Sequence, residues 1–242
     1  MAKTETGELL KILSDYVYRT IKPLSENLNT SGSKATLAIL RRGAGKTPGE
    51  MPELWGCFLR DLPEELMGTG SEPSKSEWAI YLALVMYALH QQGNDIPMNY
   101  IEDKNKNNAP NDSNNTSQQQ EQKNDTSSEE NCSNSLGTAV GKLIKTEEDA
   151  ERIIRRFNVM ATSADITELS HHLRTIISLL NSEKITLDYS KLAKDLYRYQ
   201  SSSPNTRANV RLEWGRDFYR QIHIQLKDKD EENTTENRKE NE

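Results

Sequence analysis

The chain has 242 residues, only 34% of which are hydrophobic, and a formal net charge of −6. This composition, with a mean hydropathy of −0.83, predicts that part of the chain lies outside any packed core. The longest apolar run is too short to cross a bilayer, the N-terminus lacks a signal peptide, and the two cysteines fit neither a disulfide framework nor a zinc site, so we expect a cytoplasmic protein without a membrane partner.

The first segment, residues 1–99, has the pattern of a helical bundle. Apolar residues recur at helical spacing over about residues 7–28, which predicts a long first helix. Ser74 with Glu77 forms a capping-box pattern in front of the longest apolar run. We therefore expect a buried helix that starts after Ser74 and is closed by Gly93.

Between these two helices lies the sequence GAGKT, residues 43–47, which is similar to the phosphate-binding loop of nucleotide hydrolases. That loop requires a glycine where this chain has Leu40. It also follows a β-strand, whereas the residues before GAGKT predict a helix with Ser33 as its cap candidate and Gly43 as its C-cap. We expect no nucleotide hydrolysis, which would require ATP binding that Lys46→Ala abolishes.

Two polar stretches separate and follow the regions with helical patterns. Residues 100–135 are rich in Asn, Ser, Gln and Asp, and predict a disordered insertion, because almost no side chain there can be buried. Residues 227–242 predict a disordered acidic tail of the same kind. These stretches carry net charges of −4 and −3, whereas residues 136–226 carry +3. The folded part of the chain can therefore still contact nucleic acid.

The segment 136–226 predicts a second helical bundle. Thr146 and Asp165 each precede an acidic residue by three positions, which indicates two helix starts, and Pro204 indicates a third. The last helix carries apolar residues at steps of four, which we expect to be core anchors: Val210, Trp214, Phe218 and Ile222. No segment alternates apolar and polar residues, so the predicted fold is all-α, with two small helical bundles separated by the disordered Asn/Ser-rich insertion.

The helix predicted over residues 147–161 carries a basic stripe. At 100° per residue, Arg152, Arg155 and Arg156 lie together, on the side opposite Ile153 and its apolar neighbours. Two interpretations remain open at this point. The stripe is either a phosphate-binding face or a solvated surface whose arginines pair with acidic residues one turn away.

The sequence contains no pattern typical of a catalytic site. His171 and His172 are adjacent and point about 100° apart on a helix, so they do not form the i,i+4 pair that binds a metal. Cys57 has no histidine nearby in sequence to activate it, and we expect it to be a small buried hydrophobe. We expect no enzyme activity, cofactor or metal.

Three stretches together resemble the CasB family, the small subunit of the type I-E CRISPR surveillance complex known as Cascade. They read ATLAILRRGAGKTPGEMPELW, AERIIRRFNVMATSADITELSHHLRTIISLL and VRLEWGRDFY. Their order and separation carry the resemblance, which covers roughly residues 7–99 and 136–222. The chain departs from this compact family in its long insertion and acidic tail, and in Glu213, where we would expect a basic residue.

The resemblance implies a non-catalytic, all-helical subunit, present as two copies, that contacts the backbone subunits and the large subunit of the ribonucleoprotein. Its basic faces would contact the displaced or target strand of the R-loop during antiviral defence, and modest backbone contacts can tip that nearly balanced exchange of duplexes. The residues implied as phosphate contacts are Arg41, Arg42, Arg152, Arg155, Arg156, Lys34, Arg174 and Arg207. The alternative is a purely structural adaptor that binds acidic protein partners; neither role involves a small-molecule substrate.

Overall fold

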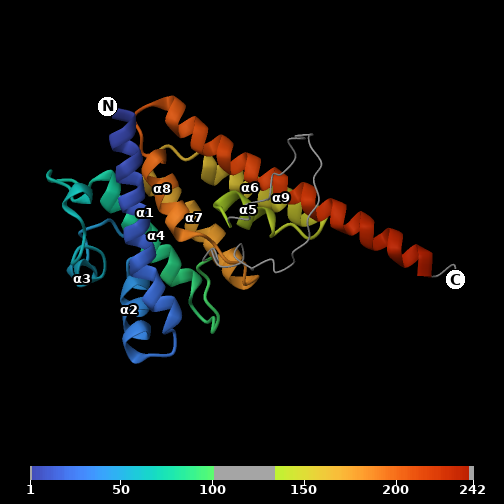
Figure 1. The fold of residues 1–242 in the computed structure, drawn as a ribbon, viewed down its shortest axis with the longest axis horizontal. Helices are drawn as coiled ribbons and strands as arrows, with labels where there is room; N and C mark the ends of the chain where they lie inside the picture. The colour runs from blue at the N-terminus through green and yellow to red at the C-terminus, as the bar shows by residue number, and fades with distance from the viewer. Residues whose placement is uncertain (1, 101–133, 240–242) are drawn as a thin grey trace, which may run out of the picture.

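The computed structural model describes residues 2–100 and 134–239, and all regular elements in these ranges are helices (Figure 1). The α-helices are α1 (Ala2–Glu26), α2 (Ser31–Arg42), α3 (Trp55–Phe58), α4 (Lys75–His90), α5 (Leu136–Gly141), α6 (Glu147–Ala161), α7 (Ile166–Ser182), α8 (Tyr189–Tyr199) and α9 (Pro204–Lys239). Two 3₁₀ helices, η1 (Pro52–Leu54) and η2 (Glu64–Leu66), flank α3. The all-α prediction is confirmed for the described residues.

Side-chain caps fix the starts of several helices as predicted. The Ser74 hydroxyl accepts a hydrogen bond from the Glu77 backbone N–H, and the Glu77 carboxylate accepts from the Ser74 N–H, so the capping box in front of α4 is complete. Thr146 and Asp165 are the N-caps of α6 and α7, and their side-chain oxygens accept from the Asp149 and Glu168 backbone N–H. Pro204 opens α9, where its missing N–H costs no helical hydrogen bond.

The cap predicted for α2 was wrong by one turn. Thr30 is the N-cap, and its hydroxyl accepts a hydrogen bond from the Ser33 backbone N–H at 3.2 Å. Ser33 is therefore the third helical residue and is buried. Both residues have the hydroxyl that a cap needs, and the sequence pattern alone did not distinguish them. Gly43 is the C-cap of α2, as predicted.

Helix α4 is the centre of the fold. Every residue from Ala79 to Ala88 is buried, because α4 is contacted by α1, α2, α7 and α8. A helix that is apolar on all sides is stable only when other helices surround it. One hydrophobic cluster includes residues from both described ranges, so the helices before and after the gap pack against each other. The division of the chain into residues 1–99 and 136–226 stays a prediction about its sequence organisation.

The short helix α5 packs closely on α9, and glycine permits this approach. A Cβ atom on Gly137 would lie 2.2 Å from the Trp214 carbonyl oxygen, and one on Gly141 would meet the Gln221 side chain at 2.8 Å. Helix α9 then extends beyond the other helices (Figure 1). Its backbone is helical as far as Lys239; the disordered tail over residues 227–242 stays a prediction.

The residues before and after the undescribed stretch, Tyr100 and Asn134, both contact the short segment that contains Leu187 and Asp188. The Tyr100 backbone N–H donates to the Leu187 carbonyl at 2.9 Å, and the Asp188 N–H donates to the Asn134 carbonyl at 2.9 Å. An isolated parallel bridge joins Asn99 to Leu187. The chain therefore leaves and re-enters the described fold at neighbouring positions, and the predicted insertion lies almost entirely outside the described residues. Within those residues, no helix is both long and apolar enough to cross a membrane.

Candidate nucleic-acid interface

Helix α6 presents its arginines away from the core, as the sequence predicted. Ile153 and Phe157 are buried, with 1% and 4% of their surface exposed. Arg152 and Arg155 are exposed, and Arg156 is half-buried. Because the buried pair fixes the rotation of α6 about its axis, the three arginines form one basic stripe on the outer side.

Two of the three arginines have no side-chain partner among the described residues. The side chains of Arg155 and Arg156 form no hydrogen bond or ion pair with any residue that the structure describes. Arg152 instead donates to the Asp149 carboxylate at 2.8 Å. The pKa of Asp149 is lowered, first by its hydrogen bond with the Thr146 side chain and then by Arg152. The stripe therefore contains two free guanidinium groups and one that is already paired at the surface.

A small groove runs between α6 and α7 beside these arginines. It has a volume of about 180 Å³ and is lined by Arg155, Arg156 and Val159 from α6, and by His172 and Thr175 from α7. Its lining is mostly apolar, and 44% of the Val159 surface is exposed. We call this feature the α6–α7 groove. It combines apolar walls with two cationic side chains at a single place.

A second pair of predicted cations lies on α2. Lys34 and Arg41 line the same pocket, of about 260 Å³, together with polar residues at the end of α4 that include Gln91, Asn94 and Asp95. The side chains of Lys34 and Arg41 form no hydrogen bond or ion pair with another described residue. Asp95 lowers the net positive charge of this pocket relative to the α6–α7 groove.

The remaining exposed candidates lie near the loop that follows α2. Arg42 forms an ion pair with Glu53 at 2.7 Å, and both side chains are more than half exposed. Arg174 on α7 places a guanidinium nitrogen 4.0 Å from where a Cβ atom on Gly45 would lie. On the helical wheel, Arg174 points at least 100° away from the groove residues His172 and Thr175. The structure thus brings Arg174 to the GAGKT loop and not to the α6–α7 groove.

Arg207 differs from the other predicted contacts because its donors are used inside the protein. Its guanidinium group donates to the Tyr199 carbonyl at 3.0 Å and to the Ala164 carbonyl at 2.9 Å, and lies 5.3 Å from the Tyr199 ring centre. Arg211 covers the same ring and donates to the Ser163 carbonyl and the Tyr199 hydroxyl. A phosphate contact by Arg207 stays a prediction that competes with these internal bonds.

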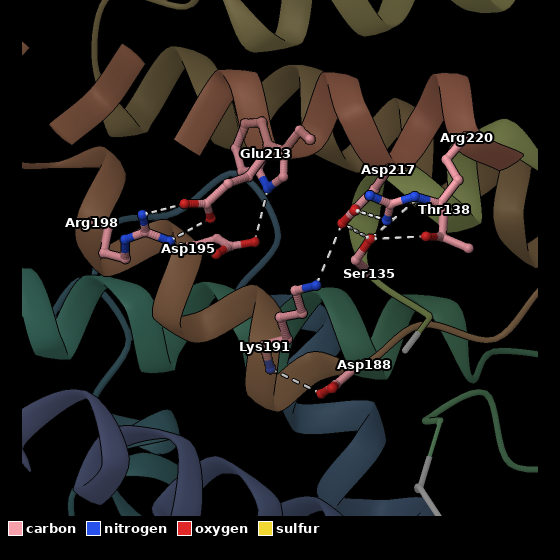
Figure 2. A network of polar contacts seen from close by, with 10 residues as sticks. Ser135, Thr138, Asp188, Lys191, Asp195, Arg198, Glu213, Asp217 and Arg220 are labelled. Atoms are coloured by element: carbon pink, nitrogen blue, oxygen red, sulfur yellow. Dashed lines mark hydrogen bonds and ion pairs between the residues drawn. The ribbon is translucent and has the colours of Figure 1, made fainter. Parts of the chain in front are cut away.

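A polar network joins α8 to α9 (Figure 2). Arg198 forms two hydrogen bonds with Glu213, at 2.6 and 2.7 Å, and this contact lowers the pKa of Glu213. Beside it, the buried Asp195 accepts a hydrogen bond from the Trp214 indole at 2.8 Å, and burial raises the Asp195 pKa to about 6. Glu213, which stands where we expected a basic residue, is thus the partner of Arg198.

The same network reaches the start of α5. Asp217 accepts a hydrogen bond from the Ser135 hydroxyl at 2.6 Å and from Lys191 at 3.4 Å, and it also pairs with Arg220 (Figure 2). Ser135 is the N-cap of α5. Because every charge in this network has an opposite neighbour, the network itself offers few free donors to a ligand.

The structure supports the argument against a phosphate-binding loop. The GAGKT sequence follows helix α2, as predicted, and not a β-strand. Trp214 and Phe218 are buried core residues, also as predicted, whereas Cys57 is only partly buried. In the described ranges, no group of three or more His, Cys, Asp or Glu residues is arranged to hold a metal ion.

The family model for CRISPR-associated protein Cse2 matches residues 36–219, which is most of the chain. The chain belongs to the Cse2 family. The fold is also similar to the crystal structure of CasB from Thermobifida fusca, with 28% sequence identity and a TM-score of 0.61, over 86% of this chain and 97% of that one. No curated protein matches the chain.

Two further solved structures share the fold of this Cse2 family member. A chain from a CRISPR RNA-guided surveillance complex has a TM-score of 0.59 and 17% identity, over 89% of this chain and 98% of that one. CasB from M. ruber has a TM-score of 0.52 and 18% identity, over 88% and 97%. The resemblance found in the sequence is confirmed at the level of the family.

Sequence reasoning missed three groove residues of this Cse2 family member: Val159, His172 and Thr175. None carries a signal of its own, because their meeting depends on how α6 packs against α7. The adjacent histidines were predicted to point apart on one helix, but their sequence gave no indication that only His172 lines the groove. His172 also lies 3.9 Å from the Glu168 carboxylate.

Proposed function

We propose that this protein is a non-catalytic small subunit of a CRISPR Cascade ribonucleoprotein, and that it stabilises the R-loop through contacts to the nucleic-acid backbone. Membership of the Cse2 family supports the first part. The observation that carries the second part is the pair Arg155 and Arg156, which lie on an outer helix face and whose side chains have no partner in the described part of the chain.

Free guanidinium groups are suited to bind phosphates. A guanidinium presents a planar fork of donors that matches a phosphate group, and binding releases counterions from the nucleic acid. Contacts of this kind are independent of sequence, so base pairing with the guide RNA would read the target. Lys34 and Arg41 on α2 and Arg174 on α7 extend the proposed phosphate contacts. Arg42 and Arg152 would first have to exchange a carboxylate partner for a phosphate.

Fluorescence anisotropy of labelled single-stranded DNA at several salt concentrations tests the backbone contact. The protein is compared with the triple variant Arg152→Ala, Arg155→Ala, Arg156→Ala. We expect salt-dependent binding by the wild type, and a salt slope shallower by about 0.7 per lost contact, so by about two in total. The loss has to be similar for different DNA sequences, since phosphates carry no sequence information.

A charge-matched control distinguishes DNA binding by this helix face from DNA binding by positive charge anywhere on the protein. Arg19, Arg60 and Arg216 are exposed arginines on other parts of the fold, and their triple alanine variant loses the same net charge. We expect this control to keep most of the affinity. If neither the wild type nor the control binds DNA at low salt, the proposal fails, and the basic stripe serves acidic protein partners as in the adaptor interpretation.

Membership of the complex has its own test. We expect the full chain to copurify with the backbone subunits, the large subunit and a second copy of itself, and we expect nuclease treatment to weaken that association. Copurification that is insensitive to nuclease would support the purely structural adaptor. Absence of these subunits from the purified material would contradict the assignment to Cascade.

A further inference from the structure

The α6–α7 groove has a mostly apolar lining that phosphate binding does not explain. Val159 lies three or four residues after the two free arginines, so all three share one face of α6, and 44% of its surface is exposed. The alkyl stems of Arg155 and Arg156 continue this apolar surface toward the charged ends. A site for phosphate alone needs only the guanidinium groups.

The size of the groove limits what it can hold. Its volume of about 180 Å³ is below the range of about 300–1,000 Å³ that is typical of pockets for drug-sized ligands. One flat ring system fits a space of this size, whereas a stacked base pair does not. The groove is also open to solvent, so a ligand in it can be part of a longer chain.

The side chains beside the groove indicate which kind of ring-shaped ligand it fits. Two guanidinium groups favour a ligand with negative charge on either side, and their flat faces stack well on aromatic rings. His172 adds an imidazole ring from α7 to the opposite wall. A nucleobase in a single strand has all of these properties, because it is an aromatic ring with a phosphate on each side.

We propose that the α6–α7 groove receives one unstacked nucleobase of a single strand, while Arg155 and Arg156 hold the flanking phosphates. The inference rests on the proposed function and adds a site for the base to it. The groove tolerates any base sequence, because every base has a flat aromatic face. It discriminates against duplex, whose bases are already stacked and paired.

Two labelled oligonucleotides of equal length and charge test the site: oligothymidylate, and an oligomer of abasic tetrahydrofuran units. Anisotropy titration at one moderate salt concentration gives the ratio of the two affinities. We expect the wild type to bind the base-bearing strand at least about fivefold more tightly, which is the lower end of the effect of stacking one base on an aromatic or arginine side chain.

Two variants place the preference in the groove. Val159→Ser removes the exposed apolar side chain, and Thr175→Leu fills part of the groove from α7 without adding an aromatic ring that could itself stack on a base; neither changes the charge. We expect both to reduce the preference to less than about twofold and to keep the salt slope for the abasic strand. Leu212→Ser is the matched control, because Leu212 is also exposed, at 50%, but lies on α9; it should keep the full preference.

The outcomes distinguish a failure of the base site from a failure of the proposed phosphate contacts. Equal, salt-dependent binding of both strands by the wild type overturns the base site and leaves the phosphate contacts standing; the groove would then fit a side chain of a neighbouring subunit. A preference that survives both groove variants also overturns it, since the base would bind elsewhere. No salt-dependent binding of either strand overturns both the groove and the proposed phosphate contacts.

Discussion

Arginine has opposite roles in two regions of this molecule, the contact between α8 and α9 and the outer face of α6. Between α8 and α9, Arg198 forms two hydrogen bonds with Glu213, and only 25% of its side chain is exposed. On α6, Arg155 and Arg156 have no partner among the described residues and border an open groove. The same residue type therefore stabilises the fold on one side and remains available to a ligand on the other.

The difference follows from the cost of removing charge from water. A guanidinium group that is partly buried needs a partner for its donors, and the bidentate contact with a carboxylate provides one. A guanidinium group on an outer helix face keeps its hydration and needs no partner. A group without a carboxylate partner can exchange water and counterions for phosphate directly, so counting arginines in the sequence does not reveal which helix face is available to a ligand.

The largest effect in this comparison should come from Asp195, the buried acid of the α8–α9 network. Asp195→Ala leaves the Trp214 indole N–H without an acceptor in the core and removes a charge close to Arg198. We expect the free energy of unfolding to fall by about 2–3 kcal/mol, measured by urea denaturation. DNA binding by the folded fraction should not change.

Asp195→Asn is the control for this prediction. Its amide oxygen can still accept the hydrogen bond from Trp214, so the loss should be clearly smaller than for alanine. Equal losses for the two substitutions would show that the hydrogen bond contributes little. A loss of DNA affinity in the folded Asp195→Ala protein would show that the α8–α9 network and the basic stripe on α6 do not act independently.

The next effect concerns the tight contact of α5 with α9. Gly137→Ala should destabilise the protein by about 1–3 kcal/mol, because the added methyl group would lie 2.2 Å from a backbone oxygen of α9 that cannot rotate away. Differential scanning calorimetry or urea denaturation gives the change. The α6–α7 groove, which Gly137 does not line, should bind DNA as before.

Gly215→Ala on α9 is the matched substitution, because a Cβ atom there meets nothing within 4 Å. We expect it to stabilise the protein by about 0.5–1 kcal/mol, since glycine costs more conformational entropy than alanine inside a helix. A similar destabilisation by both substitutions would mean that helix geometry, and not the close approach of α5, decides the effect at Gly137.

Much of the fold was predictable because its signals are local. The capping residues Ser74, Thr146 and Asp165 and the apolar spacing along the chain gave the helix starts and the all-α class, and the wheel of α6 gave the outward arginine stripe. The shared core was not predictable, because it depends on how α4 meets α7 and α8.

The candidate site was predictable only in part for the same reason. The stripe of Arg152, Arg155 and Arg156 follows from helical geometry alone. Whether an arginine is free or paired depends on residues distant in sequence, as with Arg207, which donates to the Ala164 carbonyl. The α6–α7 groove needs His172 from another helix, and no local pattern encodes that meeting.

A pH dependence of stability should distinguish the buried network from the exposed stripe. Burial raises the pKa of Asp195 to about 6 in the folded protein, whereas in the unfolded chain it is about 3.9. Between pH 4 and 6 the folded protein therefore holds a proton that the unfolded chain has lost, and the contribution of Asp195 to stability falls as the pH rises through this window.

Asp195→Asn removes this contribution. The difference in unfolding free energy between wild type and variant should shift against the wild type by up to about 1.4 kcal/mol per pH unit from pH 4 to 6. His90, whose pKa burial lowers to about 4, contributes the opposite slope, but it is present in both proteins and cancels in the difference. A difference that does not vary with pH would contradict the raised pKa.

The smallest expected effect tests how far an ion pair at the surface weakens the binding of its arginine to DNA. Arg152 is the member of the stripe that is paired, through a contact of 2.8 Å with Asp149. Asp149→Asn removes the negative charge from that contact, and we expect the affinity for single-stranded DNA to rise by about twofold, as for other weak surface pairs. Asp15→Asn, an exposed acid on α1, makes the same change in net charge and should have less effect.

The gain at Asp149 has to act through Arg152 if pairing is what distinguishes the arginines of this protein. In an Arg152→Ala background, Asp149→Asn should then give no more than the gain of the Asp15→Asn control, and the two substitutions should be non-additive in a double-mutant cycle. An undiminished gain without Arg152 would show that Asp149 repels the DNA directly. The contrast between paired and free guanidinium groups would then have to rest on Arg155 and Arg156 alone, whose side chains have no partner within the ranges that the structure describes.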